Sequence, residues 1–264
     1  MKHQSKDRLS AIEKALEILV SFADVDREVG TVEVSNLTGI HKATVSRILA
    51  TLLDYGMVSQ NDETRKYYLG PLAYRLGRSQ TGQLINALTA ISQPHVDRLR
   101  DVVAETVSLE VWVERKTVAC YLAESHNPLR VAMGPDDVLP LHAPAGAKAI
   151  LAFVSHDRVD RLIPEQLPSY TERTITSKAA LLSRLVEFNK QGYSIDNQEL
   201  YSGIYAIGVP IFDRLRKPVA AISVVMPASR ISAAREVEIV EQLKLTSRAI
   251  SKTINSRLPS FPKL

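Results

Sequence analysis

The stretch from Thr31 to Gly56 constrains the fold of this chain more than any other part of the sequence. It contains two short runs of apolar residues at helical spacing, and a single glycine, Gly39, separates them. This pattern predicts two short helices joined by a tight turn. The buried face of the second helix would consist of residues three or four positions apart, namely Val45, Ile48, Leu49 and Leu52.

The first run predicts a short helix that ends at Gly39. Thr31 is a suitable N-cap residue, because its hydroxyl can accept a hydrogen bond from a free amide at the helix start. Glu33 in the first turn complements the helix dipole. The expected buried positions of this helix are Val32, Leu37 and Ile40.

The outer side of the second helix carries small and basic side chains near its start. Lys42, Ala43, Thr44 and Arg47 are expected to point outward. A short helix, a tight turn and a second helix with such a start are what insertion into the major groove of DNA requires. Arg47 can pair with two acceptors on a guanine edge, whereas Lys42 and Thr44 suit phosphates or a single base atom. His41 is expected as a helix cap or a phosphate contact.

The residues that follow predict a β-hairpin, which would complete a winged helix-turn-helix. Residues 58–60 and 66–69 are typical of strands, and the polar sequence NDETR lies between them. Arg65 and Lys66 would lie at the tip of this wing, with Tyr67 beside them, where a wing contacts the DNA backbone or minor groove. Helix-turn-helix spacing alone also arises by chance in helical proteins, and the hairpin weakens that alternative.

The charge of the chain suits DNA binding only through local placement. The 264-residue chain has a formal net charge of +4, and residues 1–80 carry 11 basic against 10 acidic side chains. From Gly39 to Gln80 the balance is 6 basic against 3 acidic. Affinity for a polyanion must therefore come from the positions of these side chains, and dimerisation would double the number of reading helices.

The sequence lacks several features that other classes of protein require. Cys120 is the only cysteine, so one chain holds neither a disulfide nor a thiolate zinc site. No apolar run approaches the length of a membrane span, so we expect a cytoplasmic protein that associates with the nucleoid when bound to DNA. No cofactor or metal is expected, because phosphate-binding and nucleophile motifs are absent and the six histidines are scattered. His142, Lys148 and Asp196 could form a catalytic group, but we do not expect an enzyme.

Helical patterns flank the helix-turn-helix on both sides. A helix from about Leu9 to Phe22 is expected to support it. Its apolar side would consist of Leu9, Ile12, Ala15, Leu16, Leu19 and Phe22. Residues 72–88 predict a helix whose apolar positions need a partner, and a second copy of this helix is the natural candidate. Pro94 is expected to begin another helix.

The rest of the chain predicts strands flanked by helices. Residues 106–124 contain two strand-like runs around the turn ERK, and Leu129–Ala132 is expected as a third strand. Further helices are predicted at 144–154, 157–163, 177–191 and 232–254, and further strands at 204–212 and 218–226. This order favours an α+β domain on a largely antiparallel sheet.

These residues resemble the IclR family of bacterial transcription regulators over nearly the whole chain. In the amino-terminal part, ALEILVSF, TVSRILATLLDYGMV and YYLG occur in the order of that family. In the carboxy-terminal part, LPLHAPAGAKAILA, IDNQELYSGIYAIGVPIFD and AAISVV follow. The resemblance implies a winged helix-turn-helix domain at residues 1–71, a linker and dimerisation helix at 72–90, and a GAF-like effector-binding domain at 91–258. It also implies dimers or tetramers on operator DNA.

The sequence LHAPAGAKAIL indicates a ligand site independently of the family. Pro144 suits the first helical position, but Ala143 before it cannot cap the helix with a side chain. The amides of residues 145–147 would then lack internal partners. A small carboxylate is the expected ligand, and the alternative is that water or a neighbouring loop satisfies these amides.

The resemblance implies further residues of an effector pocket. Carried over position by position, the pocket includes Leu139, Ala145, Gly146, Asp196 and Ser223. Asp196 would accept a hydrogen bond from a ligand hydroxyl or hydrate, and Ser223 can donate or accept. Because an ionised Asp196 repels a carboxylate, we expect it at the opposite end of the ligand.

Two pocket positions depart from relatives that bind small keto acids. Ala206 stands where a cysteine is frequent, and Val225 stands where some relatives have a second serine. Both changes make that end of the pocket less polar, which favours a ligand with an apolar or aromatic part. Trp112 could also line the pocket, although a lone tryptophan in a hairpin is more often part of the core.

We therefore expect a dimeric or tetrameric regulator, either a repressor or an activator, that binds near-palindromic operator DNA and controls a catabolic operon. Its expected effector is a small organic acid, such as an aromatic or keto acid, and no membrane partner is expected. The main alternative is a DNA-binding module whose carboxy-terminal domain only oligomerises.

Overall fold

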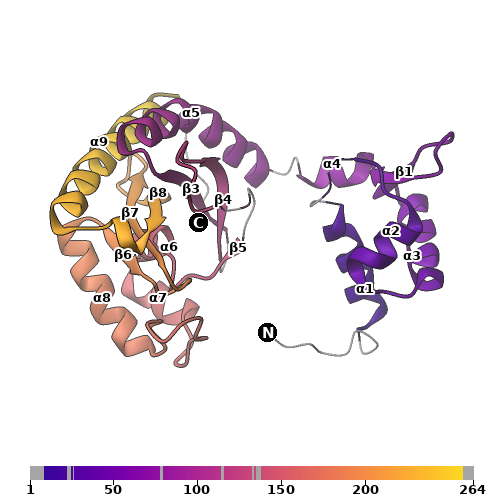
Figure 1. The fold of residues 1–264 in the computed structure, drawn as a ribbon, viewed down its shortest axis with the longest axis horizontal. Coiled ribbons are helices and arrows are strands. Elements are labelled where there is room, and N and C mark those ends of the chain that lie inside the picture. Colours follow the sequence, from indigo (N-terminus) through magenta and orange to yellow (C-terminus); the bar gives the residue numbers. More distant parts are fainter. Residues whose placement is uncertain are drawn as a thin grey trace. The chain divides into compact units, whose positions relative to one another are not determined.

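The protein is described by a computed structural model that covers residues 9–22, 25, 27–77, 80–113, 116–132, 134 and 138–257. The chain divides into two compact units, Met1–Gln83 and Leu84–Leu264. Figure 1 shows helices and a small hairpin in the first unit, and a sheet with helices on both faces in the second. Among the described helices, none has the length and apolar character to cross a membrane.

The amino-terminal unit contains the predicted helix-turn-helix and wing. Its elements are α1 (Ala11–Ser21), α2 (Thr31–Thr38), α3 (Lys42–Asp54), β1 (Val58–Gln60), β2 (Tyr67–Leu69) and α4 (Pro71–Gly77). Gly39 ends α2 with φ at 67°, which a glycine adopts without strain, so the chain turns directly toward α3. The N-cap residue of α2 is Gly30, and the expectation that Thr31 caps this helix is wrong.

The wing is an antiparallel hairpin, as the sequence predicts, with Val58 opposite Leu69. It is also held to the segment before α2. The Glu28 carboxylate accepts hydrogen bonds from Asn61 Nδ2 and Thr64 Oγ1, both at 2.8 Å. These contacts brace the turn of the wing against the rest of the unit.

The buried face of α2 differs from the expected one. Val34 and Thr38 are buried, whereas Val32 and Leu37 are 54% and 51% exposed. Only Ile40 of the expected set is buried, and it lies just after the helix. A helix of this length with apolar residues on several sides can turn any of them inward, and contacts with α1 and α3 decide which.

The buried face of α1 also differs from the expected one. Ile18 and Phe22 enter the core of the unit, whereas Ile12 and Leu16 are exposed. The helix begins as a capping box, in which Ser10 and Glu13 each accept a hydrogen bond from the other's backbone amide. This helix carries two apolar stripes, and periodicity alone does not identify the one that packs.

The carboxy-terminal unit is built on a six-stranded antiparallel sheet with the order β5-β4-β3-β8-β7-β6. Its strands are β3 (Thr106–Val113), β4 (Lys116–Ala123), β5 (Val138–Leu139), β6 (Ser194–Asn197), β7 (Ile204–Phe212) and β8 (Pro218–Pro227). Helices α5 (Gln80–Val103) and α9 (Ala233–Arg257) cover one face (Figure 1). The other face carries α6 (Ala145–Leu151), α7 (His156–Leu162) and α8 (Lys178–Gln191).

Alternation along β3 divides its side chains between the two faces of the sheet. Val107, Leu109 and Val111 pack in the core shared with α5 and α9. Trp112 packs in the second core, which α6, α7 and α8 form with the opposite face. The position of Glu110 in this alternation places it on the same face as Trp112, beneath α6.

Helix α6 lies close to the sheet because the residues beneath it are small. Ser223 on β8 pairs with Gly208 on β7, which in turn pairs with Ser194 on β6. A Cβ atom at Gly208 would lie only 2.6 Å from the carbonyl carbon of Ala145. The Ser194 hydroxyl donates a hydrogen bond to the Ala145 carbonyl at 2.5 Å. The start of α6 is therefore fixed directly on the strands.

The expected helix start at Pro94 is wrong, since Pro94 lies inside α5. Leu88 before the proline and Val96 after it are both buried in the same core, so the packed face continues through the proline. Tertiary packing thus compensates for the backbone hydrogen bond that the proline cannot make. The expected domain boundary at residue 90 falls inside this helix.

The expected strand at residues 129–132 is also wrong, and β5 at 138–139 pairs with β4 instead. Side chains hold the segment in place of strand pairing. Arg230 donates a hydrogen bond to the Leu129 carbonyl, and Thr106 Oγ1 donates to the Val131 carbonyl. The short strand β6 was not anticipated. Of the expected turn ERK, residues 114 and 115 lie outside the described residues, and Lys116 begins β4.

Gly208→Ala should lower the free energy of unfolding by about 1–3 kcal/mol, because the added methyl group overlaps the backbone at the start of α6. Urea unfolding followed by the fluorescence of Trp112, the only tryptophan, measures this change in the carboxy-terminal unit. Ser202→Ala, at an exposed loop position, is the control and should change stability by less than about 0.5 kcal/mol. Equal stability of the two variants would contradict the close approach of α6.

Candidate functional site

The start of α3 is exposed and carries the side chains that the sequence placed there. His41, Lys42, Ala43 and Arg47 are exposed, and Thr44 is half-buried. His41 is the N-cap residue, with its Nδ1 atom accepting a hydrogen bond from the Ala43 amide at 3.3 Å. The opposite side of the helix is buried as predicted, through Val45 and Leu49.

Sequence reasoning missed part of this exposed face. Ser46 and Ala50 are exposed beside Lys42 and Arg47. Helical spacing contains the signal, since positions 43, 46, 47 and 50 are three or four residues apart. The exposed surface of α3 is therefore a continuous strip of small, polar and basic groups.

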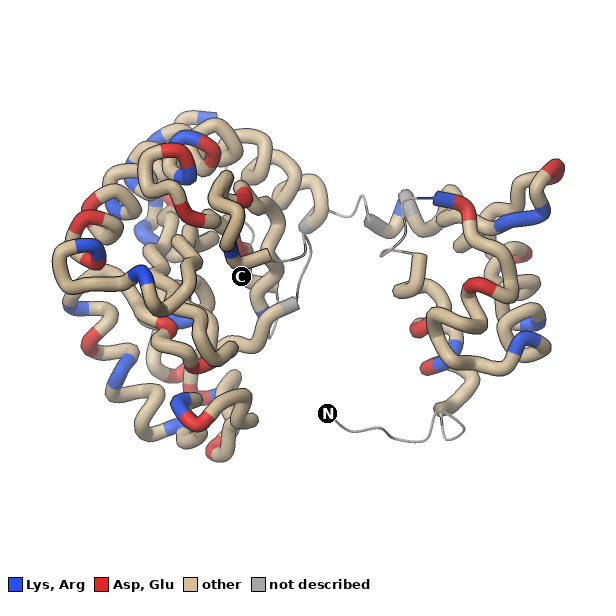
Figure 2. The backbone as a smooth tube through the Cα atoms, viewed as in Figure 1, with Lys and Arg blue, Asp and Glu red and all other residues tan. Residues whose placement is uncertain are grey.

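The wing residues differ in how exposed their side chains are. Arg65 and Lys66 are exposed, whereas Tyr67 is half-buried against the core and its backbone bridges to Val29. Tyr68, which sequence reasoning left out, is 43% exposed. Figure 2 shows basic residues on α3 and along the wing, and acidic residues at the outer end of the wing.

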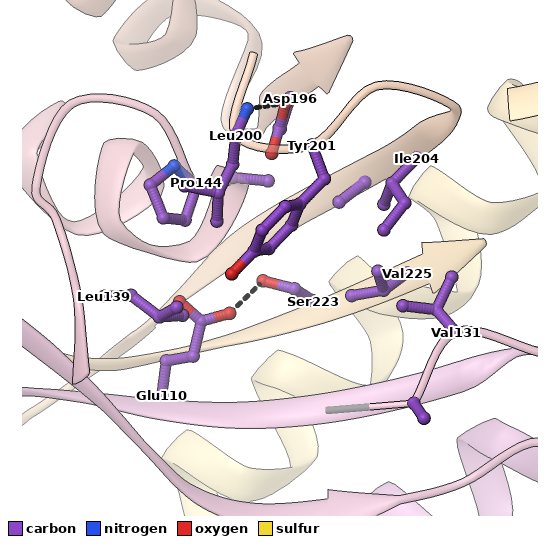
Figure 3. A pocket seen from close by; sticks show the side chains of 13 residues that line it. Glu110, Val131, Leu139, Pro144, Asp196, Leu200, Tyr201, Ile204, Ser223 and Val225 are labelled. Atoms are coloured by element: carbon purple, nitrogen blue, oxygen red, sulfur yellow. Dashed lines mark hydrogen bonds between the residues drawn. The ribbon is translucent and has the colours of Figure 1, made fainter. Parts of the chain in front are cut away.

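The second candidate site is a cavity of about 100 Å³ beside the start of α6 (Figure 3). At about 30 Å³ for each water of the liquid, that volume has room for roughly three waters, so it suits a small molecule. The residues that line it are Glu110, Val131, Ala132, Leu139, Pro144, Ala145, Asp196, Leu200, Tyr201, Ile204, Ala206, Ser223 and Val225.

The structure brings together every expected pocket residue except Gly146. Leu139, Ala145, Asp196, Ala206, Ser223 and Val225 all line the cavity. Gly146 packs against the Glu110 carboxyl group, and a Cβ atom at residue 146 would overlap that group. Trp112 belongs to the core beneath α6 and does not line the cavity.

Glu110 is the main residue that sequence reasoning missed. Its side chain is 2% exposed, and its Oε1 atom accepts hydrogen bonds from Ser223 Oγ at 2.8 Å and Ser108 Oγ at 3.0 Å. Burial raises the pKa of Glu110, and the two serine hydrogen bonds offset only part of that effect. The available signal was an acid at an alternate position of the apolar run TVSLEVWV.

Asp196 organises the loop that follows β6. Its Oδ1 atom accepts hydrogen bonds from the amides of Glu199 at 2.6 Å and Leu200 at 3.4 Å. Burial raises the pKa of Asp196 to about 6, although the positive charge of Lys148 acts in the opposite direction. The same loop brings Leu200 and Tyr201 to the cavity.

Lys148 and Glu199 form a buried ion pair close to Asp196. Lys148 Nζ lies 2.5 Å from Glu199 Oε1, and the lysine side chain is fully buried. Burial lowers the pKa of Lys148 and raises that of Glu199, in each case against the attraction of the partner charge. His142 has another partner, since its Nε2 atom lies 2.9 Å from the Pro168 carbonyl oxygen.

The start of α6 differs slightly from the expected one. The helix begins at Ala145, and Pro144 is its N-cap residue rather than its first residue, without a side-chain cap. Among the residues that the structure describes, no group of three or more His, Cys, Asp or Glu side chains could hold a metal ion.

Comparison with known proteins identifies the family. The pattern described as the IclR helix-turn-helix domain matches residues 11–62. The pattern described as the bacterial transcriptional regulator IclR C-terminal domain matches residues 85–252, which is more than half of the chain. The chain belongs to the IclR family. Its members that match this chain are DNA-binding transcriptional regulators and not enzymes.

Individual IclR relatives match along nearly the whole chain. The regulator KdgR of Escherichia coli is 34% identical over 248 residues, covering 93% of this chain and 92% of KdgR. The regulator BhcR of Paracoccus denitrificans is 32% identical over 228 residues, covering 86% of this chain and 81% of BhcR.

Solved structures of IclR proteins have the same fold. A regulator from Silicibacter sp. TM1040 is 26% identical with a TM-score of 0.70, covering 96% of this chain and 100% of its own. The C-terminal domain of E. coli KdgR is 31% identical with a TM-score of 0.59, covering 64% of this chain and 98% of its own. The winged helix and the α+β domain predicted from sequence are thus confirmed.

Asp196→Asn should gain stability relative to the wild type as the pH rises from about 4 to about 6, by up to about 3 kcal/mol. In the wild type the folded state holds a proton on Asp196 that the unfolded state releases above its ordinary pKa of 3.8. The wild type therefore loses stability through this range, and the amide variant avoids that loss.

Urea unfolding of both proteins at several pH values measures the difference. Wild-type protein at each pH is the reference, so that other titrating groups cancel. The raised pKa of Asp196 would be contradicted if the stability of Asp196→Asn minus that of the wild type stays constant or falls as the pH rises.

Proposed function

We propose that this regulator binds near-palindromic operator DNA as a dimer or tetramer and responds to a small organic acid in the cavity of its carboxy-terminal unit. The observation that supports this best is the exposure of Lys42 and Arg47 at the start of α3, next to a braced wing. Two such helices in a dimer would enter successive major grooves, with half-sites about one helical turn apart or a multiple of it.

The proposed DNA contacts divide by chemistry. Arg47 reads a base edge, while Lys42, Thr44 and the exposed edge of the His41 ring contact phosphates or single base atoms. Ala43 is small enough to let the helix approach the bases closely. Among wing residues, Arg65 and Lys66 are free to reach the backbone, and the exposure of Tyr68 makes it a better contact than Tyr67.

The proposed linker at residues 72–90 covers most of α4 and the first part of α5. We propose that it pairs with the same segment of a second copy, and that the effector changes the spacing or orientation of the two α3 helices through it. A ligand can do this only if it binds one arrangement more tightly than the other.

The proposed effector is a small aromatic or keto acid of a catabolic pathway. Val131, Leu139, Ile204 and Val225 give the cavity apolar walls, and its few polar groups converge at defined points. Such a lining is usual for sites that bind small organic molecules. Ala206 and Val225, which stand where some relatives have a cysteine and a serine, make their side of the cavity apolar.

An alternative is that the carboxy-terminal unit only oligomerises. The structural role of Asp196 in its loop favours this reading, since the carboxylate already has partners. The two readings differ in their response to ligands, because a ligand that binds the folded state raises the melting temperature by mass action.

Arg47→Ala should weaken operator binding by about 1–3 kcal/mol and relax the base preference at one position of each half-site. Fluorescence anisotropy measures this loss on an operator that the wild-type protein selects from random-sequence DNA. Arg257→Ala removes the same charge from an exposed site of the other unit and is the control. Unchanged affinity and selectivity of Arg47→Ala would show that α3 is not the reading helix.

Asp196→Ala should keep operator binding without effector and lose the effect of pyruvate or benzoate on it. Operator affinity and melting temperature are measured with and without millimolar acid. If neither acid raises the melting temperature of the wild type, the oligomerisation reading is favoured. If Asp196→Ala is unfolded, the carboxylate has a structural role in place of the proposed one.

A further inference from the structure

We propose that Glu110 determines the specificity of the pocket as an uncharged carboxyl group that donates a hydrogen bond to an oxygen of a bound small monocarboxylic acid. This proposal rests on the proposed function, in which the cavity holds the effector. It assigns to Glu110 a role that neither the family resemblance nor the local sequence indicated.

The position of Glu110 makes it part of the cavity wall. Its side chain extends from β3 to the face of the sheet that α6 covers, and only 2% of it is exposed. Figure 3 shows the carboxyl group on the Ser223 side of the cavity, with Tyr201 extending into the same space. An oxygen of a ligand in this small volume would lie close to the carboxyl group.

The hydrogen bonds of Glu110 determine which oxygen carries the proton. Oε1 already accepts from the hydroxyls of Ser108 and Ser223. Oε2 has no hydrogen-bond partner among the described residues. A proton on Oε2 is therefore the arrangement that satisfies Oε1, and it leaves one buried donor without a partner in a side chain that lines the cavity.

The serine that was expected to contact the ligand cannot serve as its main donor. A hydroxyl has one proton, and Ser223 gives that proton to Glu110 at 2.8 Å. Ser223 and Glu110 thus form a chain in which the serine orients the carboxyl group. The hydrogen-bond donor at this end of the cavity is therefore the protonated Oε2 of Glu110.

The charges around the cavity explain why Glu110 stays neutral. The described lining residues include two carboxyl groups, Glu110 and Asp196, and no lysine, arginine or histidine. The buried cation near Asp196, Lys148, is paired with Glu199. Within the described part of the chain, no cation at the cavity wall thus compensates a charge on Glu110, and an ionised Asp196 opposes it.

The same charges restrict the ligand. A monoacid can bring one negative charge if Glu110 remains protonated and shares its proton with the ligand carboxylate. A dicarboxylate or a phosphate would bring a second charge next to Asp196. We therefore infer that the pocket accepts small monocarboxylic acids and rejects dianions of similar size.

The proposal predicts a pH dependence with a defined sign. Loss of the Glu110 proton replaces a donor by a negative charge, so binding of a monoacid weakens as the pH rises through the raised pKa of Glu110. Two other ionisable groups line the cavity, Asp196 on β6 and Tyr201 on the loop after β6, and the paired Lys148 and Glu199 lie near Asp196. A matched variant at residue 110 separates its contribution from theirs.

The first test measures the protonation state of Glu110 without ligand or DNA. Carbon-13 NMR of the full chain with labelled glutamate carboxyl groups, compared with Glu110→Gln, identifies the Glu110 signal. We expect the signal of a protonated carboxyl group at neutral pH. The signal of an ionised carboxylate would overturn the proposal.

The second test measures binding of pyruvate and benzoate by calorimetry between about pH 7 and about pH 9. Wild-type affinity should fall with rising pH once Glu110 ionises, by up to about tenfold for each pH unit above its pKa. Glu110→Gln, whose amide can still donate, should bind within about threefold of the wild type near pH 7 and show a flat profile. Glu110→Ala should lose about tenfold or more.

Malonate, the dianionic probe, should bind the wild type at least about tenfold more weakly than pyruvate. Absence of binding by both monoacids, equal binding of malonate, or the same pH profile in Glu110→Gln would overturn the proposal. If Glu110→Ala does not fold, the pH dependence of ligand binding by Glu110→Gln tests the proposal without it.

Operator binding without ligand, measured on the same variants, separates this proposal from the proposed function. If the variants bind DNA as the wild type does and the predictions for Glu110 fail, only the role of Glu110 is wrong. If the wild type itself does not bind DNA selectively, the proposed function is wrong, whatever the protonation state of Glu110.

Discussion

The direct packing of α6 on the sheet is the interaction on which the cavity depends. Gly208 and Ser194 are small enough for the backbone of the helix start to reach the strands, and Ser194 fixes it with a hydrogen bond. Because the helix begins there, its first residues and the strands β7 and β8 form two walls of one cavity. The same closeness buries Glu110, which is 2% exposed, and this burial raises the pKa of its carboxyl group.

Burial of acids without a matching cation has consequences for both stability and function. Glu110 and Asp196 each have a raised pKa, which means that folding opposes their ionisation. Such groups often occur where a protein binds or senses a ligand, because the ligand can change the local charge balance. The Lys148–Glu199 pair joins α6 to the loop after β6, which carries Tyr201. A ligand in the cavity therefore contacts two elements that one buried ion pair connects.

The sequence predicted the features that depend on local patterns and missed those that depend on tertiary contacts. The glycine turn at Gly39 and the hairpin of the wing follow from local chemistry and are confirmed. The inward faces of α1 and α2 and the continuity of α5 through Pro94 depend on packing partners. Glu110 was missed because the sequence does not show that β3 passes beneath α6 and that Gly146 leaves space for a carboxyl group.

The most direct test of how this protein recognises an acid is a crystal structure of the full chain soaked with pyruvate. We expect the ligand carboxylate within about 3 Å of Glu110 Oε2, with the keto end toward Asp196. Density for the carboxylate beside Asp196, or for pyruvate only outside the cavity, would contradict the proposed roles of both carboxyl groups.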